Sequence, residues 1–291
     1  MQKSGNEKND AGRAQKNGKM ISDKLKRKYI KLKEILKKYE SLLVAYSGGV
    51  DSSLLLKVAR DVLGKNVLAV IARSETYTKE EGKTAVKFAK KLGVRHKVIY
   101  IDEFSDENFL SNPPERCYYC KKELFSKLVD IAKKEGIRHV ADGSNVSDLS
   151  DFRPGTNASK ELGIRSPLKE AGLTKDDIRQ LSRQLKLPTW NKPALACLAS
   201  RIPYGTRITK DILKKIEKGE KYLRELGLKQ VRVRHHGNLV RIEADKCDLP
   251  SLIECGIGDK IGKKFKDLGY TYVTIDVGGY RTGSMNEALS S

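Results

Sequence analysis

LLVAYSGGVDSS, residues Leu42 to Ser53, carries the clearest structural signal in this 291-residue chain. Its apolar first half predicts a strand at Leu42–Tyr46. Two glycines follow, which let the backbone turn sharply and approach a ligand closely. Ser52 and Ser53 are predicted to begin a helix that runs to Leu63. Because the free N–H groups and the positive end of such a helix attract anions, the stretch predicts a turn that binds phosphate.

The sequence motifs that are present and absent indicate which phosphate bond of a nucleotide would be cleaved. A Walker A sequence, G-x-x-x-x-G-K-[ST], does not occur in the chain, which disfavours transfer of a γ-phosphate. The SGGxDS pattern instead resembles the PP-loop of ATP pyrophosphatases. That resemblance implies that ATP is cut between its α and β phosphates, that the loop holds the pyrophosphate and that a substrate is adenylylated. A glycine-rich turn that only packs a helix on a sheet is the structural alternative, which explains Asp51 and the two serines poorly.

Strand-like runs alternate with helix-period segments along the first half of the chain. This order predicts an α/β fold, a parallel twisted sheet with helices on both faces. Ligands of such sheets bind at the carboxyl ends of the strands. Four segments are expected there: the turn at Ser47–Gly49, which we call the SGG loop, the segment Ala72–Tyr77, the loop reaching Cys117, and Asp142–Asn145. The predicted strands are Leu42–Tyr46, Asn66–Ile71, Lys97–Ile101 and Arg138–Ala141.

A second, smaller α/β domain is predicted at residues 208–291, because the expected elements change to the order α-β-β-α-β. Residues 21–207 are assigned to the PP-loop domain with a linker that carries Cys197. Residues 1–20 lack apolar periodicity and are predicted to be a disordered basic tail. The elements expected in the second domain are Lys210–Leu226, Gln230–Arg234, Leu239–Glu243, Leu249–Leu268 and Tyr270–Asp276.

Composition limits the setting in which the protein works. No run of 18 apolar residues occurs, so no membrane span and no membrane partner is expected, and five cysteines in a chain this long do not form a secreted disulfide framework. A cytoplasmic location with reduced thiols is predicted. The net charge of +21 suits nucleic acid, anionic small molecules or a lysine-rich exterior, and no RNA-binding signature favours the first.

Three cysteines are candidates for chemistry. Cys117 and Cys120 have the Cys-x-x-Cys spacing of metal ligands, and Cys197 is the best third ligand. Arg201 is expected to lower the pKa of the Cys197 thiol. Three thiolates suit a [4Fe–4S] cluster with one open iron, whereas structural zinc needs a fourth ligand. A redox pair and unrelated cysteines remain alternatives. Cys247 and Cys255 are interpreted as buried apolar residues.

Several arginines are candidate anion ligands. Arg232 and Arg234 alternate along one strand and therefore face the same side, where they can grip a phosphate; two solvated arginines on an edge strand are the alternative. Arg201 stands beside the Cys197 thiol in sequence. Arg281 lies in the glycine-rich segment Gly278–Glu287 and is expected to fold over a site.

Together these segments resemble the LarE family over nearly the whole chain after the tail. The most specific part is Cys-Leu-Ala-Ser-Arg-Ile-Pro-Tyr-Gly, within Ala196–Tyr204. The remaining segments are Ser47–Ser53, Ala72–Tyr77, Asp142–Asn145, Arg232–Gly237 and Gly279–Glu287.

The resemblance implies an ATP-dependent sulfur transferase that converts pyridinium-3,5-biscarboxylic acid mononucleotide to its thiocarboxylic acid, towards the nickel-pincer nucleotide cofactor. Many members sacrifice the sulfur of the cysteine matching Cys197. This chain adds Cys117 and Cys120, and so looks like the branch in which three cysteines hold [4Fe–4S] and deliver sulfide catalytically. The family also forms homo-oligomers.

The residue roles implied by this resemblance fall into three groups. Cys117, Cys120 and Cys197 carry the cluster, with sulfide or another sulfur donor as co-substrate, and Asp51 positions Mg²⁺. Substrate is held by Arg201, Arg232, Arg234 and Arg281. ATP is bound by Ser47, Gly48, Gly49, Asp51, Ser52, Ser53, Arg73 and Gly143.

Other functions compete with this one. A PP-loop tRNA thiolase also uses three cysteines and suits a basic chain, and salt-sensitive tRNA binding would identify it. The absence of a dedicated RNA-binding module disfavours nucleic acid as a partner. A non-catalytic nucleotide-binding or iron–sulfur carrier protein would release no pyrophosphate. An ammonia-using ligase shares the loop but gives no reason for three thiols.

Overall fold

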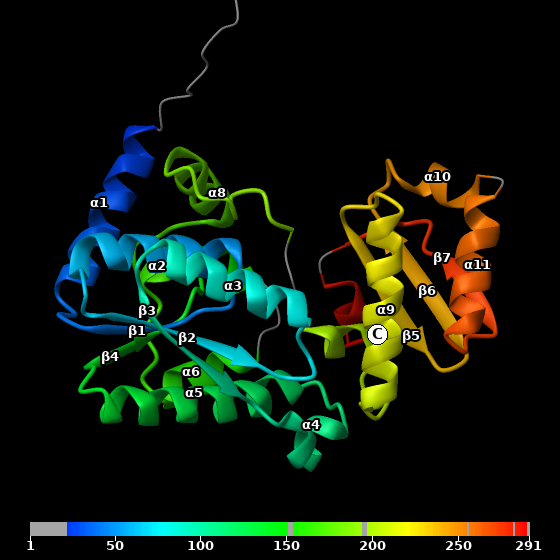
Figure 1. Ribbon diagram of the computed structural model, residues 1–291, viewed down its shortest axis with the longest axis horizontal. Coiled ribbons are helices and arrows are strands. Elements are labelled where there is room, and N and C mark those ends of the chain that lie inside the picture. Colours follow the sequence, from blue (N-terminus) through cyan, green and yellow to red (C-terminus); the bar gives the residue numbers. More distant parts are fainter. Residues whose placement is uncertain (1–21, 151–153, 194–196, 255, 282, 290–291) are drawn as a thin grey trace, which may run out of the picture.

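The structure, a computed structural model, describes residues 22–150, 154–193, 197–254, 256–281 and 283–289. Two sheets form separate lobes that lie side by side (Figure 1). We call the part built around the first sheet the N-terminal lobe and the part built around the second the C-terminal lobe. The expected tail at residues 1–20 lies outside the described residues.

The sheet of the N-terminal lobe is parallel throughout, in the order β3-β2-β1-β4. Because consecutive strands run in the same direction, each carboxyl end lies at one edge, where the SGG loop follows β1. This confirms the predicted α/β class. The strands are β1 (Leu42–Ala45), β2 (Val67–Arg73), β3 (Arg95–Tyr100) and β4 (His139–Ala141).

Helices cover both faces of this sheet (Figure 1), and alternate strand residues point to the two sides. Leu42 and Val44 pack in the core under α1, α2, α3, α7 and α8, whereas Leu43 packs in the core above α5 and α6. The helices are α1 (Asp23–Lys37), α2 (Val50–Leu63), α3 (Lys79–Lys91), α4 (Glu107–Leu110), α5 (Arg116–Lys134), α6 (Gly155–Glu161), α7 (Pro167–Glu170) and α8 (Lys175–Gln184), with short 3₁₀ turns η1 (Glu103–Ser105) and η2 (Val146–Ser150).

The C-terminal lobe has the predicted α-β-β-α-β order with one difference. The helix expected at Leu249–Leu268 is two helices, because Gly256 adopts a left-handed conformation with φ of 84°. Strands β5 and β6 are antiparallel, and β7 joins β6 in parallel. The elements are η3 (Leu198–Arg201), α9 (Lys210–Glu225), β5 (Val231–His236), β6 (Leu239–Ala244), α10 (Leu249–Ile253), α11 (Ile257–Asp267), β7 (Tyr272–Ile275) and η4 (Ser284–Leu289).

The core of the C-terminal lobe is not built from its own segment alone. Phe109 and Leu110 of α4 and Leu198, Ala199 and Ile202 around η3 are buried in the same cluster as the α9 and β5 side chains. Backbone hydrogen bonds add to this packing, since the Ile208 amide donates to the Leu110 carbonyl over 2.9 Å. These contacts fix the segment that follows Cys197 between the two lobes.

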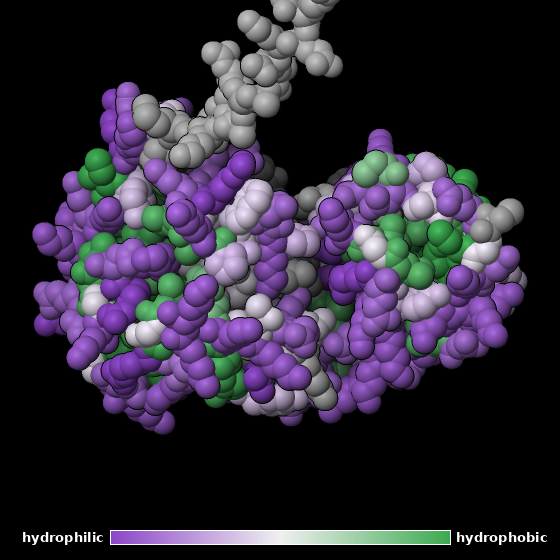
Figure 2. Space-filling model, turned by 45° about the horizontal axis from the view of Figure 1, so that its top comes forward, coloured by the Kyte–Doolittle hydropathy of each residue, from purple (hydrophilic) through white to green (hydrophobic). Residues whose placement is uncertain are grey.

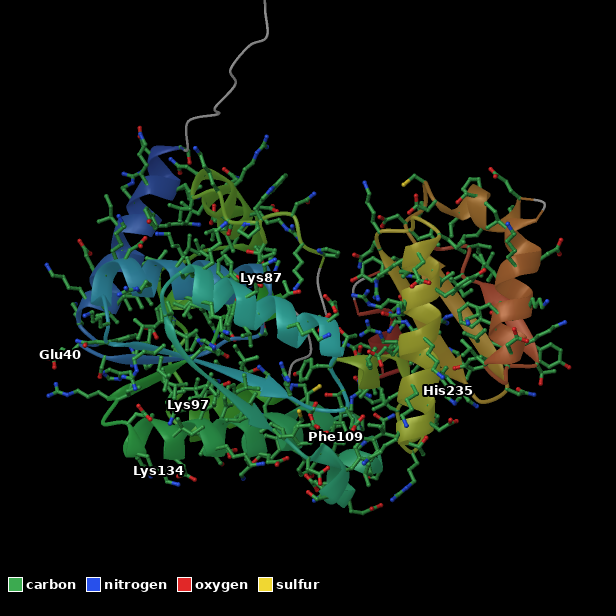
Figure 3. The ribbon with its side chains drawn as sticks, in the orientation of Figure 1. Glu40, Lys87, Lys97, Phe109, Lys134 and His235 are labelled. Carbon is green, nitrogen blue, oxygen red and sulfur yellow. The ribbon has the colours of Figure 1, made fainter. Side chains whose placement is uncertain are left out.

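The visible exterior is mostly hydrophilic (Figure 2). Exposed lysines are spread around the N-terminal lobe: Lys87 lies on α3, Lys97 on β3 and Lys134 on α5 (Figure 3). Charge distributed in this way is typical of a solvated surface. None of the described helices is long and apolar enough to cross a bilayer.

Candidate active site

The SGG loop is held by its own hydroxyl groups. Ser47 Oγ lies 3.0 Å from Ser52 Oγ and accepts a hydrogen bond from the Gly49 amide over 3.3 Å. Gly48 has a φ of 74°, which favours glycine. Helix α2 begins at Val50, two residues before the predicted start, and its N-cap Gly49 has no side-chain cap, so first-turn amides are left for a ligand.

The two serines after Asp51 differ in position. Ser52 takes part in the loop, whereas Ser53 is fully buried and lies 3.3 Å from the Tyr46 hydroxyl. Burial raises the pKa of Tyr46 to about 12, so the phenol stays protonated and able to donate. Ser53 therefore ties α2 to the end of β1 through its hydroxyl, and its amide already donates to the Gly49 carbonyl over 3.0 Å.

Gly143, after β4, is close to the start of α2. A Cβ added there would lie 3.0 Å from the Ser52 nitrogen and 3.2 Å from its Cα. Asn145 follows and donates through Nδ2 to Asp51 Oδ1 over 3.4 Å. The carboxyl ends of β1 and β4 thus meet at the loop, as predicted. Arg73, at the end of β2, is exposed and packs beside Gly82 of α3.

Two lysines that sequence reasoning missed lie against the loop. Lys175 Nζ pairs with Asp51 Oδ2 at 2.5 Å, and Lys192 Nζ donates to the Gly48 carbonyl over 3.0 Å. Burial lowers the pKa of Lys192, and the nearby carboxylate of Glu81 counteracts this. The Asn191-Lys192-Pro193 run was interpreted only as linker, and nothing in its spacing signalled a contact with Gly48, 144 positions away.

The candidate cysteines lie where α5 begins and where η3 begins. Cys117 was expected at the end of a loop and Cys120 on the helix that follows, and both lie on α5, since that helix begins at Arg116. Cys117 is exposed, while Cys120 and Cys197 are half-buried and border the C-terminal core. Cys120 Sγ donates to Glu103 Oε1 at 3.8 Å. Among the residues that the structure describes, no three His, Cys, Asp or Glu side chains converge as metal ligands would.

The three thiols influence one another electrostatically. Burial raises the pKa of Cys120, and Cys197, Glu103 and Cys117 raise it further. Burial also raises the pKa of Cys197, which Arg116 opposes and Cys117 reinforces. The expectation that Arg201 lowers the pKa of Cys197 is therefore wrong, because the guanidinium that acts on this thiol is that of Arg116. Cys247, expected to be buried, is exposed, and Cys255 lies outside the described residues.

Arg201, Arg232 and Arg234 come together between η3 and β5, but all three are buried, so the interpretation as solvated arginines is wrong. Arg201 Nε pairs with Glu220 Oε1 at 2.8 Å, and its Nη1 donates to the Cys197 carbonyl over 2.9 Å. Burial lowers the pKa of Arg232 to about 10, and the neighbouring charge of Arg201 adds to this. Such an accumulation of cations favours an anionic ligand.

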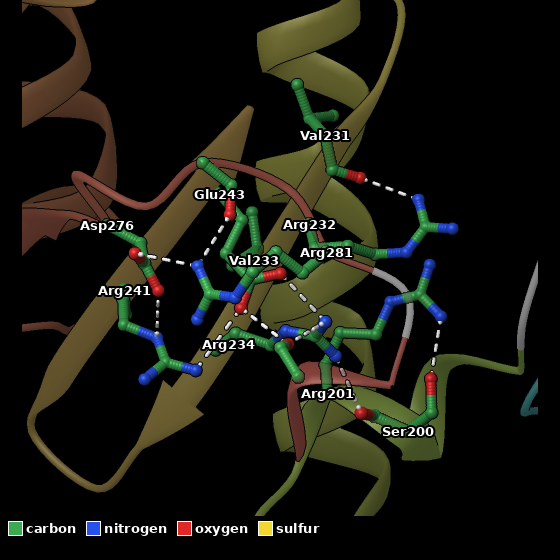
Figure 4. A network of polar contacts seen from close by, with 12 residues as sticks. Ser200, Arg201, Val231, Arg232, Val233, Arg234, Arg241, Glu243, Asp276 and Arg281 are labelled. Atoms are coloured by element: carbon green, nitrogen blue, oxygen red, sulfur yellow. Dashed lines mark hydrogen bonds and ion pairs between the residues drawn. The ribbon is translucent and has the colours of Figure 1, made fainter. Parts of the chain in front are cut away.

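Carboxylates already balance part of this charge (Figure 4). Arg234 Nη2 pairs with Glu243 Oε2 at 2.8 Å and donates to Ser284 Oγ at 2.8 Å. Arg281 was expected to fold over a site, and it pairs with Asp276 at 3.4 Å and with Glu287 at 3.1 Å. It therefore belongs to the outer part of the same network. Thr282, which is part of the segment Gly279–Glu287, lies outside the described residues.

The loop, the thiols and the arginines border one region. The Leu198 amide donates to the Thr76 carbonyl over 2.9 Å, which joins η3 to the segment after β2. Glu81, on α3, lies within electrostatic range of both Lys192 at the SGG loop and Arg201. These contacts bring the carboxyl edge of the sheet, where the strand order predicts ligand binding, together with the start of the C-terminal lobe.

A parallel sheet with an SGGxDS loop between β1 and α2, and with a thiol and cationic side chains at the same edge, defines an α/β enzyme of the PP-loop class. Residues 23–117 match the NAD synthase family, which covers this loop and the first three strands. A tRNA-specific 2-thiouridylase of Syntrophus aciditrophicus is 29% identical over 197 residues, 56% of this chain and 52% of that protein.

Other relatives match almost end to end. The pyridinium-3,5-bisthiocarboxylic acid mononucleotide synthase of Lactiplantibacillus plantarum is 43% identical over 256 residues, 88% of this chain and 92% of the synthase. An uncharacterized protein of Synechocystis is 42% identical over 266 residues, 91% of this chain and 99% of that protein. The chain belongs to the LarE family of the PP-loop superfamily.

Proposed function

We propose that this protein is an ATP-dependent sulfur transferase that activates a carboxylate of pyridinium-3,5-biscarboxylic acid mononucleotide and converts it to a thiocarboxylate. The observation that carries the proposal is that the SGG loop, Cys197 and the buried arginines border one region. The chain is also 43% identical to a synthase of the bisthiocarboxylic acid mononucleotide. Each part supplies one requirement of the reaction.

The reaction has two steps. A carboxylate oxygen of the substrate attacks the α-phosphorus of ATP, the bond between the α-phosphorus and the bridging oxygen breaks, and pyrophosphate leaves. The acyl adenylate that results has AMP as a leaving group, which is far better than oxide. Hydrosulfide then attacks the acyl carbon, the bond to AMP breaks, and thiocarboxylate, AMP and one proton are released. No oxidant or reductant is consumed.

The SGG loop is proposed to bind the pyrophosphate. The free amides at the start of α2 and the ammonium groups of Lys175 and Lys192 present positive charge to it, and they act without transferring protons. Asp51 supplies the carboxylate through which Mg²⁺ is held together with the ATP phosphates, a donor set that suits this ion. Arg73 and Gly143 border the proposed adenosine site.

Cys117, Cys120 and Cys197 would hold a [4Fe–4S] cluster. The support is the chemistry of the donor set, because three thiolates leave one iron of such a cluster open, and the three thiols influence one another electrostatically. When bound, the cluster would supply an iron with an open position for the sulfur donor. The half-buried Cys120 and Cys197 limit the access of water to the site. Arg201, Arg232 and Arg234 are proposed to bind the substrate's phosphate and carboxylates, with Arg281 supporting them through Asp276.

Thiolation of tRNA is the second candidate function. The similarity to the tRNA-specific 2-thiouridylase favours it, but that similarity covers about half of each chain, whereas the synthase is matched nearly throughout. Salt-dependent binding of tRNA to this protein, with thiolated nucleoside as product, would establish this function instead.

The setting of the enzyme is also a proposal. We place it in the cytoplasm, as a homo-oligomer, with residues 21–207 forming the ATP-binding part and residues 208–291 a smaller domain that serves assembly. The separate three-stranded sheet of the C-terminal lobe supports this division.

Replacement of Cys197 tests the proposed function. Cys197→Ala is expected to abolish formation of thiocarboxylate while release of pyrophosphate from ATP continues, because adenylylation does not need the thiol. Both products are measured in one anaerobic reaction, and Cys247→Ala, which removes an exposed cysteine, is the matched control. Loss of both products in Cys197→Ala alone would remove Cys197 from its proposed role.

A further inference from the structure

Arg116 is a buried cation next to the thiols. It occupies the first position of α5, only 3% of its surface is exposed, and its positive charge lowers the pKa of the Cys197 thiol against the effect of burial. Sequence reasoning did not select it, although it directly precedes Cys117. The question is what balances its charge.

The groups that hold Arg116 are neutral. Its Nη1 donates to Asn112 Oδ1, and its guanidinium carbon lies 5.0 Å from the centre of the Tyr204 ring. Asn112 is itself fixed, since its Nδ2 donates to the carbonyls of Pro203 over 2.7 Å and Thr206 over 2.9 Å. The guanidinium is therefore held firmly by groups that do not neutralise it.

Throughout the described part of the chain, Arg116 pairs with no carboxylate, and its Nε and Nη2 make no hydrogen bond. Arg201 and Arg234, which are comparably buried, each pair with a glutamate at 2.8 Å. A buried charge without a counter-ion is costly, and the cost is recovered when an anion binds. Arg116 thus differs from Arg201 and Arg234 in having no anionic partner among the described residues.

We propose that Arg116 binds the sulfur donor, inorganic hydrosulfide, beside Cys197. This inference rests on the proposed function and assigns one residue to its second substrate. Hydrosulfide is chosen as the anion because Arg116 directly precedes Cys117 and its charge acts on Cys197, the thiols beside which the proposed reaction needs its sulfur donor. The planar guanidinium, with two free donor atoms, holds the monoanion near the acyl group that it attacks.

The test compares Arg116→Gln and Arg116→Lys with wild type. Binding of sodium sulfide is measured by anaerobic equilibrium dialysis of each purified protein, and steady-state assays give KM values for sulfide, ATP and the nucleotide substrate. Arg207→Gln is the matched control, since it removes an exposed arginine with the same change of net charge. Thermal unfolding checks that each variant folds.

Arg116→Gln is expected to raise both the Kd and the KM for sulfide about tenfold or more, as loss of a charge-assisted contact does, with the KM for ATP unchanged. Arg116→Lys should fall between Arg116→Gln and wild type. An unchanged sulfide Kd in Arg116→Gln, or an effect on the nucleotide KM in place of the sulfide KM, would overturn the proposal.

Two outcomes are kept apart by the design. Wild-type protein that binds sulfide through Arg116 but releases no pyrophosphate would refute the proposed function and leave the sulfide site standing. If both variants fail to fold, wild-type dialysis with sodium thiocyanate decides: competition of this small anion with sulfide supports the site, and its absence contradicts it.

Discussion

Individual residues in this protein have roles that depend on partners far away in sequence. Arg201 pairs with Glu220, and Arg234 pairs with Glu243, and neither spacing follows a helix or strand repeat that would have signalled it. Sequence reasoning therefore found the arginines and missed their carboxylates. Arg116 was missed for the same reason. What distinguishes it is that no carboxylate among the described residues pairs with it, and the sequence does not show this.

Gly143 offers a test of the loop at this scale. A methyl group at this position would lie 3.0 Å from the Ser52 nitrogen, and both contacts are with backbone, which does not move aside easily. Gly143→Ala is expected to destabilise the protein by about 1–3 kcal/mol, as overpacking does, and to raise the KM for ATP because the start of α2 shifts. Chemical unfolding and ATP-dependent pyrophosphate release measure the two effects. Wild-type values in both would contradict the close contact between Gly143 and the Ser52 backbone.

At the scale of elements, local signals predicted most of the fold. Thr78 caps α3 and Thr174 forms a capping box on α8, as hydroxyl residues before amphipathic segments indicate. The errors arose where tertiary contacts overrode the pattern. The first turn of α5, from Arg116, was taken for the end of a loop, because the apolar helix repeat begins only at Cys120. The break at Gly256 was hidden because apolar residues continue on both sides.

Packing between α9 and α11 gives the element-scale prediction. A Cβ at Gly219 would lie 2.6 Å from a Phe265 ring carbon, whereas a Cβ at Gly262 would meet nothing within 4 Å. Replacement of a helical glycine by alanine gains about 1 kcal/mol of helix propensity. At Gly219 a clash of about 1–3 kcal/mol outweighs that gain.

We therefore expect Gly219→Ala to lower and Gly262→Ala to raise the free energy of unfolding, as measured in urea. The second variant is the control, because both glycines lie inside long helices of the same lobe and differ in what surrounds them. Equal effects of the two substitutions would mean that the contact between α9 and Phe265 does not limit stability.

At the scale of the whole molecule, the two lobes share the segment that carries Cys197. Residues of α4 and η3 are buried with the C-terminal core, so stability of that lobe affects the geometry of the region where the lobes meet. The cations that matter for the proposed chemistry are the few that lie at the loop and between the lobes. Stability of the C-terminal lobe is therefore relevant to catalysis.

His235 makes that stability dependent on pH. Its Nδ1 lies 3.1 Å from the Tyr270 hydroxyl between β5 and α9, and burial lowers its pKa, with Lys215 and His236 adding to the effect and Asp211 opposing it. Above the unfolded pKa of about 6.5 the imidazole is neutral in both states and its contribution is complete. As the pH falls below that value, His235 binds a proton in the unfolded chain but stays neutral in the folded chain, so the free energy of unfolding decreases.

The free energy of unfolding should therefore decrease between about pH 7 and pH 5, by up to about 1.4 kcal/mol per pH unit for each such histidine. His235→Phe removes one proton-binding group and is expected to flatten this slope, while lowering stability at neutral pH because the contact with the Tyr270 hydroxyl is lost. His236 and His139, whose pKa values burial also lowers, keep part of the slope. Urea unfolding at several pH values measures it, and an identical slope in His235→Phe and wild type would show that the neutral imidazole is not required by the fold.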